Sequence, residues 1–331
     1  MKSSTMKAIV CTSYGSPDYL QLQDRPLPTP KDNEVLVEVH ASTVTKADTM
    51  MRRADPFISR FFLGLTKPKA AITGTGFSGI VVAVGKDVRH LEPGDAIFGE
   101  TGVSFGANAE YLTVGEEDVI SIKPENLSFE AAATVTDGPL TSLNFLTNVY
   151  QLKAGQHILI NGASGSLGTA AVQLAKHLGA EVTGVCSAKN AELVRSLGAD
   201  HVIDYNEVDF TKTGQTYDVI YDTVGKRSFG ECKPALRPNG AYISPVLGFR
   251  LLMDMIFSGK GKKAKFEATG LQAPKVLRPM LEQLANLLES EKLAIVIDRQ
   301  YPLSETPAAH RYVDTGHKRG NVVIQVKASA A

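Results

Sequence analysis

Residues 158–175 constrain the fold of this 331-residue chain more than any other stretch. They read ILINGASGSLGTAAVQLA, which is an apolar run typical of a strand, a glycine-rich turn, and a helix that starts with small residues. Gly165 lets the backbone approach a pyrophosphate, Gly168 lets the helix pack closely on the strand, and the helix N-terminus offers unpaired N–H groups. Ala163 stands where the usual fingerprint has its first glycine, yet the flanking strand and helix supply the context that the motif needs. The stretch predicts a dinucleotide-binding turn, with an ordinary glycine-rich turn as the alternative.

Charge and cysteine content exclude several classes of protein. The 35 basic and 35 acidic residues cancel, so no bulk field attracts nucleic acid or an anionic membrane, and we expect neither as a partner. The cysteines Cys11, Cys186 and Cys232 are isolated and odd in number, which argues against a disulfide framework and favours the cytoplasm. The first ten residues lack an apolar leader, and no run of about eighteen apolar residues occurs, so we expect neither secretion nor a membrane span.

The sequence pattern changes near residue 127. Short β-type runs broken by Gly, Pro and Asp fill residues 7–126 and predict a compact, mostly antiparallel barrel. From Ser128 onward helices and strands alternate, which predicts a doubly wound parallel sheet. We expect a mostly β domain at residues 1–126, an α/β domain at 127–267, and a return of residues 268–331 to the first domain.

Particular elements follow from the apolar periodicity and the turn signals. The expected strands are residues 35–39, 79–84, 110–114, 181–186, 201–203, 218–222, 241–244, 295–298 and 321–326, and the expected helices start at Ser128 and span 141–149, 169–178, 191–197, 226–235 and 273–291.

Residues 247–265 place an apolar run directly before a basic one. The apolar residues are Leu251, Leu252, Met253, Met255, Ile256 and Phe257, and the basic ones are Lys260, Lys262, Lys263 and Lys265. An amphipathic surface segment is one interpretation. We favour a subunit contact, or a lid over the active cleft with a solvated basic end, because the net charge gives no membrane bias.

The choice of dinucleotide depends on the end of the second strand. NAD sites use a carboxylate there for the ribose hydroxyls, and a carboxylate would repel a 2′-phosphate. No acid follows Cys186 before Glu192, so the site favours NADPH. Ser187 can donate a hydrogen bond to the 2′-phosphate, Lys189 can supply charge, and Tyr205 can contact the same phosphate or the adenine edge. The alternatives are an exposed lysine at a helix start and a packing tyrosine.

Several further motifs extend over nearly the whole chain. They are GTGFSGIVVAVG at 74–85, PGDAIFG at 93–99, AEY at 109–111, LSFEAAA at 127–133, LTSL at 140–143, NGASGSLG at 161–168, LGAD at 197–200 and KRGNVVI at 318–324. On these motifs the chain resembles the medium-chain dehydrogenase/reductase superfamily, in its zinc-less quinone oxidoreductase and alkenal/enone reductase branch. The resemblance implies a GroES-like catalytic domain, a Rossmann cofactor domain, an active cleft between them, and a homodimer.

The resemblance also bears on metal binding. Zinc-dependent relatives carry a cysteine in the segment matching 44–48, Gly-His-Glu at 74–76, and a four-cysteine lobe. Thr45, Thr75 and Gly76 cannot supply thiolate, imidazole or carboxylate, so we predict no metal. His40 and His90 have no second His or Cys at ligand spacing, and we expect them to be surface or loop residues.

Without a metal, hydrogen bonds must polarise the acceptor while the nicotinamide delivers hydride to a quinone or to an α,β-unsaturated carbonyl. Relatives often place Asn at the position of Thr45, which makes Thr45 the candidate orienting donor. Asp48 orients a ribose or a water, or else serves a turn or cap. Asp137 is a general acid if burial raises its pKa, or else caps a helix that starts near Thr141. No Ser-His-Asp or Ser-Tyr-Lys arrangement can be defended, so no proton donor is assigned.

The remaining expected contacts are to the cofactor. The glycine turn contributes Ser164, Gly165, Ser166, Leu167 and Gly168, and Thr141 faces the nicotinamide. The resemblance adds backbone contacts from Val224, Val246, Leu247, His317, Lys318 and Arg319.

Three functions compete at this point. The first is an NADPH-dependent quinone or enone reductase. The second is an NADPH-binding sensor or structural protein with little turnover, and the third is a zinc-type alcohol dehydrogenase. The acceptor stays open, because its pocket walls come from segments such as 50–65 and 247–257, which the sequence does not place.

Overall fold

The computed structural model describes residues 4–55, 57–69, 71–257 and 261–327. The chain forms two compact units. Unit 1 consists of Met1–Asp137, Ala273–Glu291 and Ile297–Ala331, and unit 2 of Gly138–Gln272 and Lys292–Val296. The sequence pattern predicts a second domain from residue 127, whereas unit 1 continues to Asp137. The physical reason is helix α3 (Phe129–Ala132), which packs on the unit 1 sheet and adds Phe129 and Ala133 to an apolar cluster with Val323.

Unit 2 contains a six-stranded sheet in which every described strand pair is parallel. Its spatial order is β10-β9-β8-β11-β12-β13, which confirms the doubly wound α/β prediction. The strands are β8 (His157–Asn161), β9 (Glu181–Cys186), β10 (His201–Asp204), β11 (Tyr217–Asp222), β12 (Leu236–Ser244) and β13 (Lys263–Phe266). The order reverses at β8, and ligands of such sheets bind outside the carboxyl ends of the strands at this reversal.

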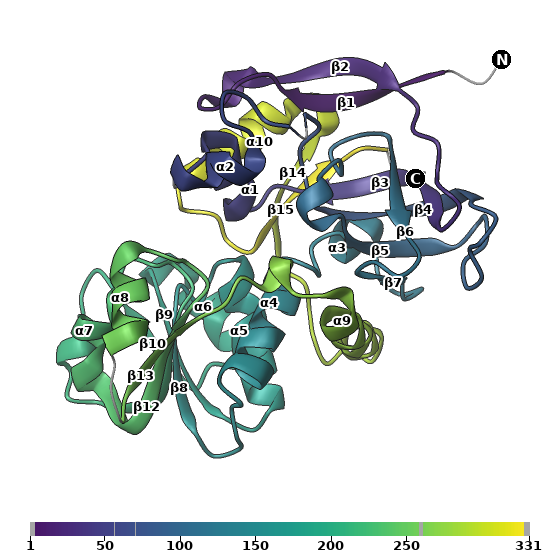
Figure 1. Ribbon diagram of the computed structural model, residues 1–331. Coiled ribbons are helices and arrows are strands. Elements are labelled where there is room, and N and C mark those ends of the chain that lie inside the picture. The colour runs from purple at the N-terminus through teal and green to yellow at the C-terminus, as the bar shows by residue number, and fades with distance from the viewer. Residues whose placement is uncertain (1–3, 56, 70, 258–260, 328–331) are drawn as a thin grey trace. The chain divides into compact units, whose positions relative to one another are not determined.

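The central strands of unit 2 are apolar because both faces of the sheet are covered. In β8 the residues Ile158, Leu159 and Ile160 are fully buried, as is typical of parallel strands between two helical layers. Figure 1 shows α4 and α5 on one side of this sheet and α7 and α8 on the other. The helices are α4 (Gly138–Asn144), α5 (Ser166–His177), α6 (Ala191–Ser196), α7 (Phe229–Cys232) and α8 (Phe249–Phe257).

Unit 1 is mostly antiparallel, as expected. Its larger sheet has the order β14-β15-β3-β4-β5-β7, with β6 also pairing β3, and its smaller sheet is the hairpin β1-β2. Two register shifts in the β3–β4 pair bend the sheet, since an extra residue increases local twist. The strands are β1 (Thr5–Cys11), β2 (Leu20–Pro26), β3 (Glu34–Thr43), β4 (Gly76–Val84), β5 (Ala96–Glu100), β6 (Tyr111–Gly115), β7 (Ile120–Ile122), β14 (Ile297–Pro302) and β15 (Asn321–Gln325).

The last part of the chain completes unit 1. Strand β15 pairs β3 antiparallel at Val323↔Thr43 and β14 in parallel, so the terminal strand belongs to the first domain, as the sequence analysis expected. The remaining helices of the unit are α1 (Lys46–Arg53), α2 (Arg60–Leu63), α9 (Pro274–Glu289) and α10 (Thr306–Asp314). Within the described residues, no helix is long and apolar enough to span a bilayer.

Helix α8 lies in the apolar part of the 247–265 segment. Leu251 is buried and Met255 packs against the core of unit 2, whereas Phe249 and Ile256 are exposed. The basic end is bonded to unit 2: Lys262 Nζ donates to Lys233 O at 2.8 Å, and Lys265 Nζ donates to Val149 O. Lys260 and the side chain of Phe257 lie outside the described residues.

Candidate active site

The glycine-rich turn joins β8 to α5 within unit 2. The N–H groups of Gly162 and Ala163 both donate to Val185 O at 3.0 Å, and Gly165 N–H donates to Gly162 O at 3.0 Å. Gly162 adopts a φ of +84°, a conformation that disfavours a side chain, so the turn glycine lies one position before Ala163. Helix α5 begins after Gly165 with no side-chain cap from the described residues. Its first N–H groups and the positive end of its dipole are therefore suited to an anionic ligand.

The other two glycines of the turn differ in what surrounds them. A Cβ on Gly168 would lie 2.1 Å from Gly162 O, which confirms that this glycine permits close packing of helix on strand. A Cβ on Gly165 would meet only Gly162 O at 3.5 Å. The chain therefore leaves space beside Gly165, and a pyrophosphate needs such space to approach the backbone.

Asp222 accepts several hydrogen bonds at this end of the sheet. The sequence pattern did not point to it as a site residue. Its Oδ1 accepts hydrogen bonds from Asn161 Nδ2 at 2.8 Å and from the N–H groups of Val224 and Gly225 at 3.1 Å each. Its Oδ2 accepts from Tyr242 Oη at 2.8 Å. The sequence does carry a signal for Asp222, because it is an acid at the end of a strand and a turn that contains Val-Gly follows it.

The residues expected around a 2′-phosphate come together at the ends of β9 and β10. The pairing Asp204↔Cys186 places Ser187 and Tyr205 at the next position of two neighbouring parallel strands, and Tyr205 N–H donates to Cys186 O at 3.2 Å. Tyr205 is 52% exposed, so its ring is not a packing residue of the core. Lys189 is exposed in the same loop.

Asn190 links this loop to the glycine turn. It is buried, and its Nδ2 donates to Ser164 Oγ at 3.0 Å. Nothing in the sequence pattern had pointed to it. Leu167 lies in the first turn of α5, where its carbonyl accepts from Ser142 Oγ at 2.9 Å, and Ser166 is buried.

The backbone groups expected to contact the cofactor are partly used within the chain. The N–H of Val246 donates to Ser244 Oγ at 3.2 Å, and Val224 N–H bonds Asp222 as described, whereas Leu247 is 45% exposed. The carbonyl oxygens of Val224 and Val246 are therefore the backbone groups that these residues can offer to a ligand. Thr141 lies half-buried inside α4.

The segment 317–319 belongs to unit 1. The N–H of Arg319 donates to Asp298 Oδ2 at 2.7 Å, His317 N–H donates to Thr315 Oγ1 at 3.3 Å, and Lys318 Nζ donates to Gly320 O at 2.8 Å. The backbone donors of His317 and Arg319 are therefore engaged within unit 1.

Thr45 and Asp48 form a capping box at the start of α1. Thr45 donates its N–H and its hydroxyl proton to Asp48 Oδ2 at 2.8 and 2.7 Å, and Asp48 N–H donates to Thr45 Oγ1 at 3.1 Å. The cap that the sequence analysis held as one interpretation of Asp48 is confirmed. The hydroxyl proton of Thr45 is used in this box, so Thr45 can orient an acceptor only if that bond breaks. Burial raises the pKa of Asp48 to about 6.

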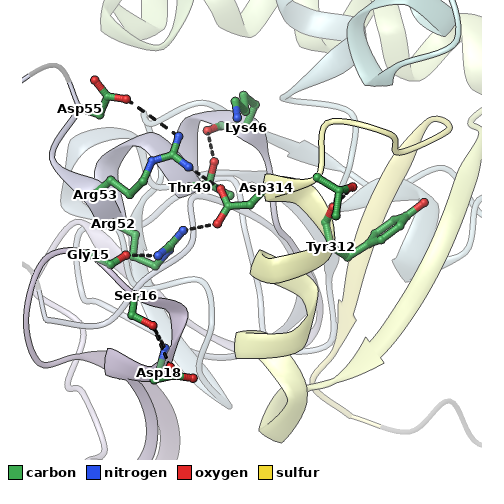
Figure 2. A network of polar contacts seen from close by, with 11 residues as sticks. Gly15, Ser16, Asp18, Lys46, Thr49, Arg52, Arg53, Asp55, Tyr312 and Asp314 are labelled. Atoms are coloured by element: carbon green, nitrogen blue, oxygen red, sulfur yellow. Dashed lines mark hydrogen bonds and ion pairs between the residues drawn. The ribbon is translucent and has the colours of Figure 1, made fainter.

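Helix α1 is tied to α10 by buried charges, as Figure 2 shows. The Arg52 side chain is 1% exposed and donates to Asp314 Oδ2 and to Gly15 O, while Arg53 donates to Asp314 Oδ1 at 2.6 Å. Asp314 thereby holds two consecutive arginines of α1. Because Asp48 lies on the same helix, the contacts of Arg52 and Arg53 with Asp314 also help to position the Asp48 carboxyl.

A cavity of about 250 Å³ opens beside α1 within unit 1. Asp48, Tyr14 and Arg52 supply polar groups to its wall. The apolar part of the lining comes from Met51, Leu63, Ile72, Val103 and Phe105. An apolar pocket with a few convergent polar groups is the usual form of a small-molecule site.

Asp137 lies half-buried in the turn before α4. The helix begins at Gly138 rather than near Thr141, so the start expected for it was three residues late. Burial raises the pKa of Asp48 and of Glu100, and the charge of Asp137 adds to both shifts. Burial lowers the pKa of Lys318, and the charge of Asp137 opposes that shift. Unit 1 thus gathers four ionisable groups, of which the sequence analysis had named all but Glu100.

Metal ligands are not assembled in the part of the chain that the structure describes: no group of three or more His, Cys, Asp or Glu side chains is placed to hold an ion. His40 lies within β3 rather than in a loop, with its ring 4.2 Å from that of Phe129, and burial lowers its pKa. His90 is exposed before β5.

One unit is a parallel α/β sheet with an uncapped glycine turn, and the other is a β-rich unit with a buried acid in an apolar cavity; each feature is typical of a pyridine-nucleotide oxidoreductase. Comparison with known proteins gives the family. The profile described as "Alcohol dehydrogenase GroES-like domain" matches residues 31–125, and the one described as "Zinc-binding dehydrogenase" matches 197–324.

Individual relatives cover almost the whole chain. The chain is 33% identical to the mouse protein named NAD(P)H oxidoreductase RTN4IP1, mitochondrial, over 98% of this chain and 90% of the relative. It is 30% identical to the NADPH-dependent alkenal/one oxidoreductase, chloroplastic, of Arabidopsis thaliana, over 96% and 79%. The solved quinone oxidoreductase of Coxiella burnetii superposes with a TM-score of 0.87 at 31% identity, covering 98% and 100%. The chain belongs to the medium-chain dehydrogenase/reductase family, among its quinone oxidoreductases and alkenal/enone reductases.

Proposed function

We propose that this protein is an NADPH-dependent reductase that transfers hydride, without zinc, to a quinone or to the carbon–carbon double bond of an α,β-unsaturated carbonyl. The observation that carries the proposal is the end of β9, where no acid follows Cys186 before Glu192, together with Ser187, Lys189, the neighbouring Tyr205 and the uncapped N-terminus of α5. The names of the Arabidopsis and Coxiella relatives support both the cofactor and the acceptors.

In unit 2, the α5 N–H groups hold the pyrophosphate, and Ser187 and Lys189 hold the 2′-phosphate. NADPH, when bound, supplies the hydride. In unit 1, the apolar wall of the cavity takes the ring or chain of the acceptor and excludes water, and Asp48 orients a polar group at its edge. This division of tasks is typical of cofactor enzymes, in which the protein contributes binding, orientation and electrostatics.

Independence from zinc is supported by the packing at Gly76. A Cβ there would lie 2.8 Å from Ala133 O and 2.9 Å from Thr43 Oγ1, so a side chain reaching from this position has no room. Thr45 supplies no thiolate, and its hydroxyl is bound to Asp48. The residues present do not fit a catalytic zinc ion, which needs three nitrogen, sulfur or carboxylate ligands from the protein.

The test is a panel of quinones, alkenals and an alcohol, run with NADPH and NADH in parallel on protein dialysed against a chelator. We expect oxidation of NADPH by quinones or enones, a clear preference over NADH, and no loss after chelation. Chelator-sensitive oxidation of the alcohol would replace this proposal with the zinc-type dehydrogenase.

A second candidate is an NADPH-binding protein with little turnover. The engaged hydroxyl of Thr45 favours it, because the candidate orienting donor is then occupied. In the same panel, tight NADPH binding without oxidation on any acceptor would support this candidate, and rapid turnover would eliminate it.

We also propose a cytoplasmic homodimer that contacts neither nucleic acid nor membranes. The balanced charge and the three free, buried cysteines support these assignments. Light scattering of the purified chain tests the dimer, and fractionation of expressing cells tests the compartment.

A further inference from the structure

Tyr14 forms part of the wall of the cavity in unit 1. It lies in the connection between β1 and β2 and is 8% exposed. The next residue, Gly15, is bound to helix α1 on both sides of its peptide unit. Gly15 N–H donates to Arg52 O at 3.0 Å, and Arg52 Nη1 donates to Gly15 O (Figure 2). These two hydrogen bonds fix the chain beside Tyr14 against the helix that carries Asp48.

The hydroxyl of Tyr14 reaches a second part of the cavity wall, residues 57–69. It donates to Gly64 O at 2.8 Å, and this hydrogen bond is buried. The segment supplies three residues to the lining of the cavity, Leu63, Pro68 and Lys69. Within the described residues, the other hydrogen bonds of the segment join its own members, such as Lys69 N–H to Leu63 O at 2.8 Å. The Tyr14 hydroxyl therefore ties this part of the wall to the rest of unit 1.

The partners of Tyr14 within the segment are themselves held in place. Gly64 adopts a φ of +124°, and a Cβ on it would lie 2.1 Å from Lys67 O, so the backbone folds back tightly at the carbonyl that Tyr14 binds. The guanidinium of Arg60 lies 5.0 Å from the centroid of the Tyr14 ring and 4.8 Å from that of Phe57. A cation–π contact thus holds the ring, while the hydrogen bond holds the hydroxyl.

The cavity that Tyr14 bounds is small for a ligand site. Its volume is about 250 Å³. A cavity of about 150 Å³ holds one benzene molecule, and small-molecule sites usually measure about 300–1,000 Å³. The cavity therefore suits a single ring with small substituents, and a group as large as a second ring must displace part of the wall.

We propose that Tyr14 limits the size of the acceptor. This inference rests on the proposed function, because it names which quinones and enones the cavity admits. The ring of Tyr14 fills space that a bulky substituent would need, and its hydroxyl keeps residues 57–69 in place as another part of the wall. The preferred acceptors are therefore single-ring quinones and short-chain enones with small substituents.

The test measures the NADPH-dependent reduction of three 1,4-benzoquinones that carry a methyl, a tert-butyl or a phenyl substituent. The reacting ring is the same in all three, and dividing each rate of a variant by that of wild type cancels the reactivity of the acceptor itself. We expect wild type to prefer the methyl compound. In Y14A, the ratio of kcat/KM for the phenyl compound to that for the methyl compound should rise at least about tenfold, mainly through KM.

Two further variants separate the ring of Tyr14 from its hydroxyl. Y14F keeps the ring, so it should keep the order of preference while KM rises for all three quinones. Y14L has a side chain of intermediate size, and its ratio should lie between those of wild type and Y14A. Tyr19 ends the same connection, is 42% exposed and does not line the cavity, so Y19A and Y19F are the matched controls and should behave as wild type.

Limited digestion with trypsin tests the hydrogen bond to Gly64 without any acceptor. Arg60 and Lys69 are the cleavage sites in the segment. We expect cleavage there to be several times faster in Y14F than in wild type or Y19F, because the segment has lost its tie to unit 1. NADPH affinity should be the same in all variants, since Tyr14 is not among the proposed cofactor contacts.

A merely structural role of Tyr14 would lower the rates on the three quinones by one common factor. If wild type reduces these quinones and Y14A and Y14L keep the wild-type ratio, the assignment of Tyr14 is overturned and the proposed function stands. A wild type that prefers the phenyl compound, or equal cleavage of Y14F and Y19F, also overturns the assignment. A wild type that oxidises NADPH with no quinone or enone refutes both proposals.

Discussion

Replacing Gly168 by alanine tests the packing on which the cofactor turn depends. The added Cβ would lie 2.1 Å from Gly162 O and within 2.7 Å of two backbone atoms of Ala163. A carbon and an oxygen normally stay more than 3 Å apart, and backbone atoms cannot rotate away as a side chain does. Helix α5 must therefore move from β8 by about an ångström.

The expected change in the free energy of unfolding of G168A is the sum of two opposing contributions. Alanine is favoured over glycine inside a helix by about 1 kcal/mol. Overpacking against rigid neighbours costs about 1–3 kcal/mol, and this contact lies at the severe end. We expect G168A to lower the free energy of unfolding of unit 2 by about 2 kcal/mol and, because the α5 N-terminus shifts, to weaken NADPH binding at least about tenfold.

Urea denaturation followed by circular dichroism and fluorescence titration of NADPH measure both effects. G230A is the matched control, because Gly230 is also helical and its Cβ would meet only side-chain atoms at ordinary contact distances, Arg250 Nη2 at 3.5 Å and Ser228 Oγ at 4.0 Å. We expect G230A to be as stable as wild type or up to about 1 kcal/mol more stable. If G168A has the same free energy of unfolding as G230A and binds NADPH as tightly as wild type does, the close approach of α5 to β8 is refuted.

Three further predictions concern charge. S187D should weaken the binding of NADPH by like-charge repulsion while affecting the binding of NADH far less. Equal losses of affinity for the two cofactors in parallel titrations would reject the phosphate site. D314N leaves the buried Arg52 guanidinium without its carboxylate, so urea unfolding should show a loss of about 3 kcal/mol; a loss under about 0.5 kcal/mol would contradict a structural clamp. Burial lowers the pKa of His310 to about 3, so below pH 6.5 only the unfolded chain takes up this proton and wild-type stability falls with pH. H310L should remove this slope, worth about 2 kcal/mol at pH 5, and parallel curves for the two proteins from pH 7 to 5 would refute it.

The elements of unit 2 could be predicted because local signals and burial agree there. The run of β8 is apolar on both faces, and the expected strand at 181–186 matches β9. The predicted boundary at residue 127 precedes α3, whereas α3 packs with unit 1. Which sheet a short helix covers depends on distant partners, here Val323 of β15.

The candidate site was predicted in part. The glycine turn at 161–168 and the acid-free strand end at 186–191 are each formed by a few consecutive residues, so the local sequence alone points to them. Asn190 went unnoticed because a single polar residue carries no pattern. Its hydrogen bond to Ser164 forms only when the packing of the two loops brings these residues together.

The sequence by itself determined a parallel α/β unit with a glycine-rich turn and a β-rich unit, and it predicted that Ser187 and Lys189 contact a cofactor phosphate. These are short-range properties, since apolar periodicity and glycine placement act over a few turns of chain. Only the tertiary structure decided that Thr45 and Asp48 bind each other, that Asp314 holds α1, and that burial raises the pKa of Asp48. Burial and the field of neighbouring charges are set by residues far apart in sequence, and a pKa therefore exists only once the chain has folded.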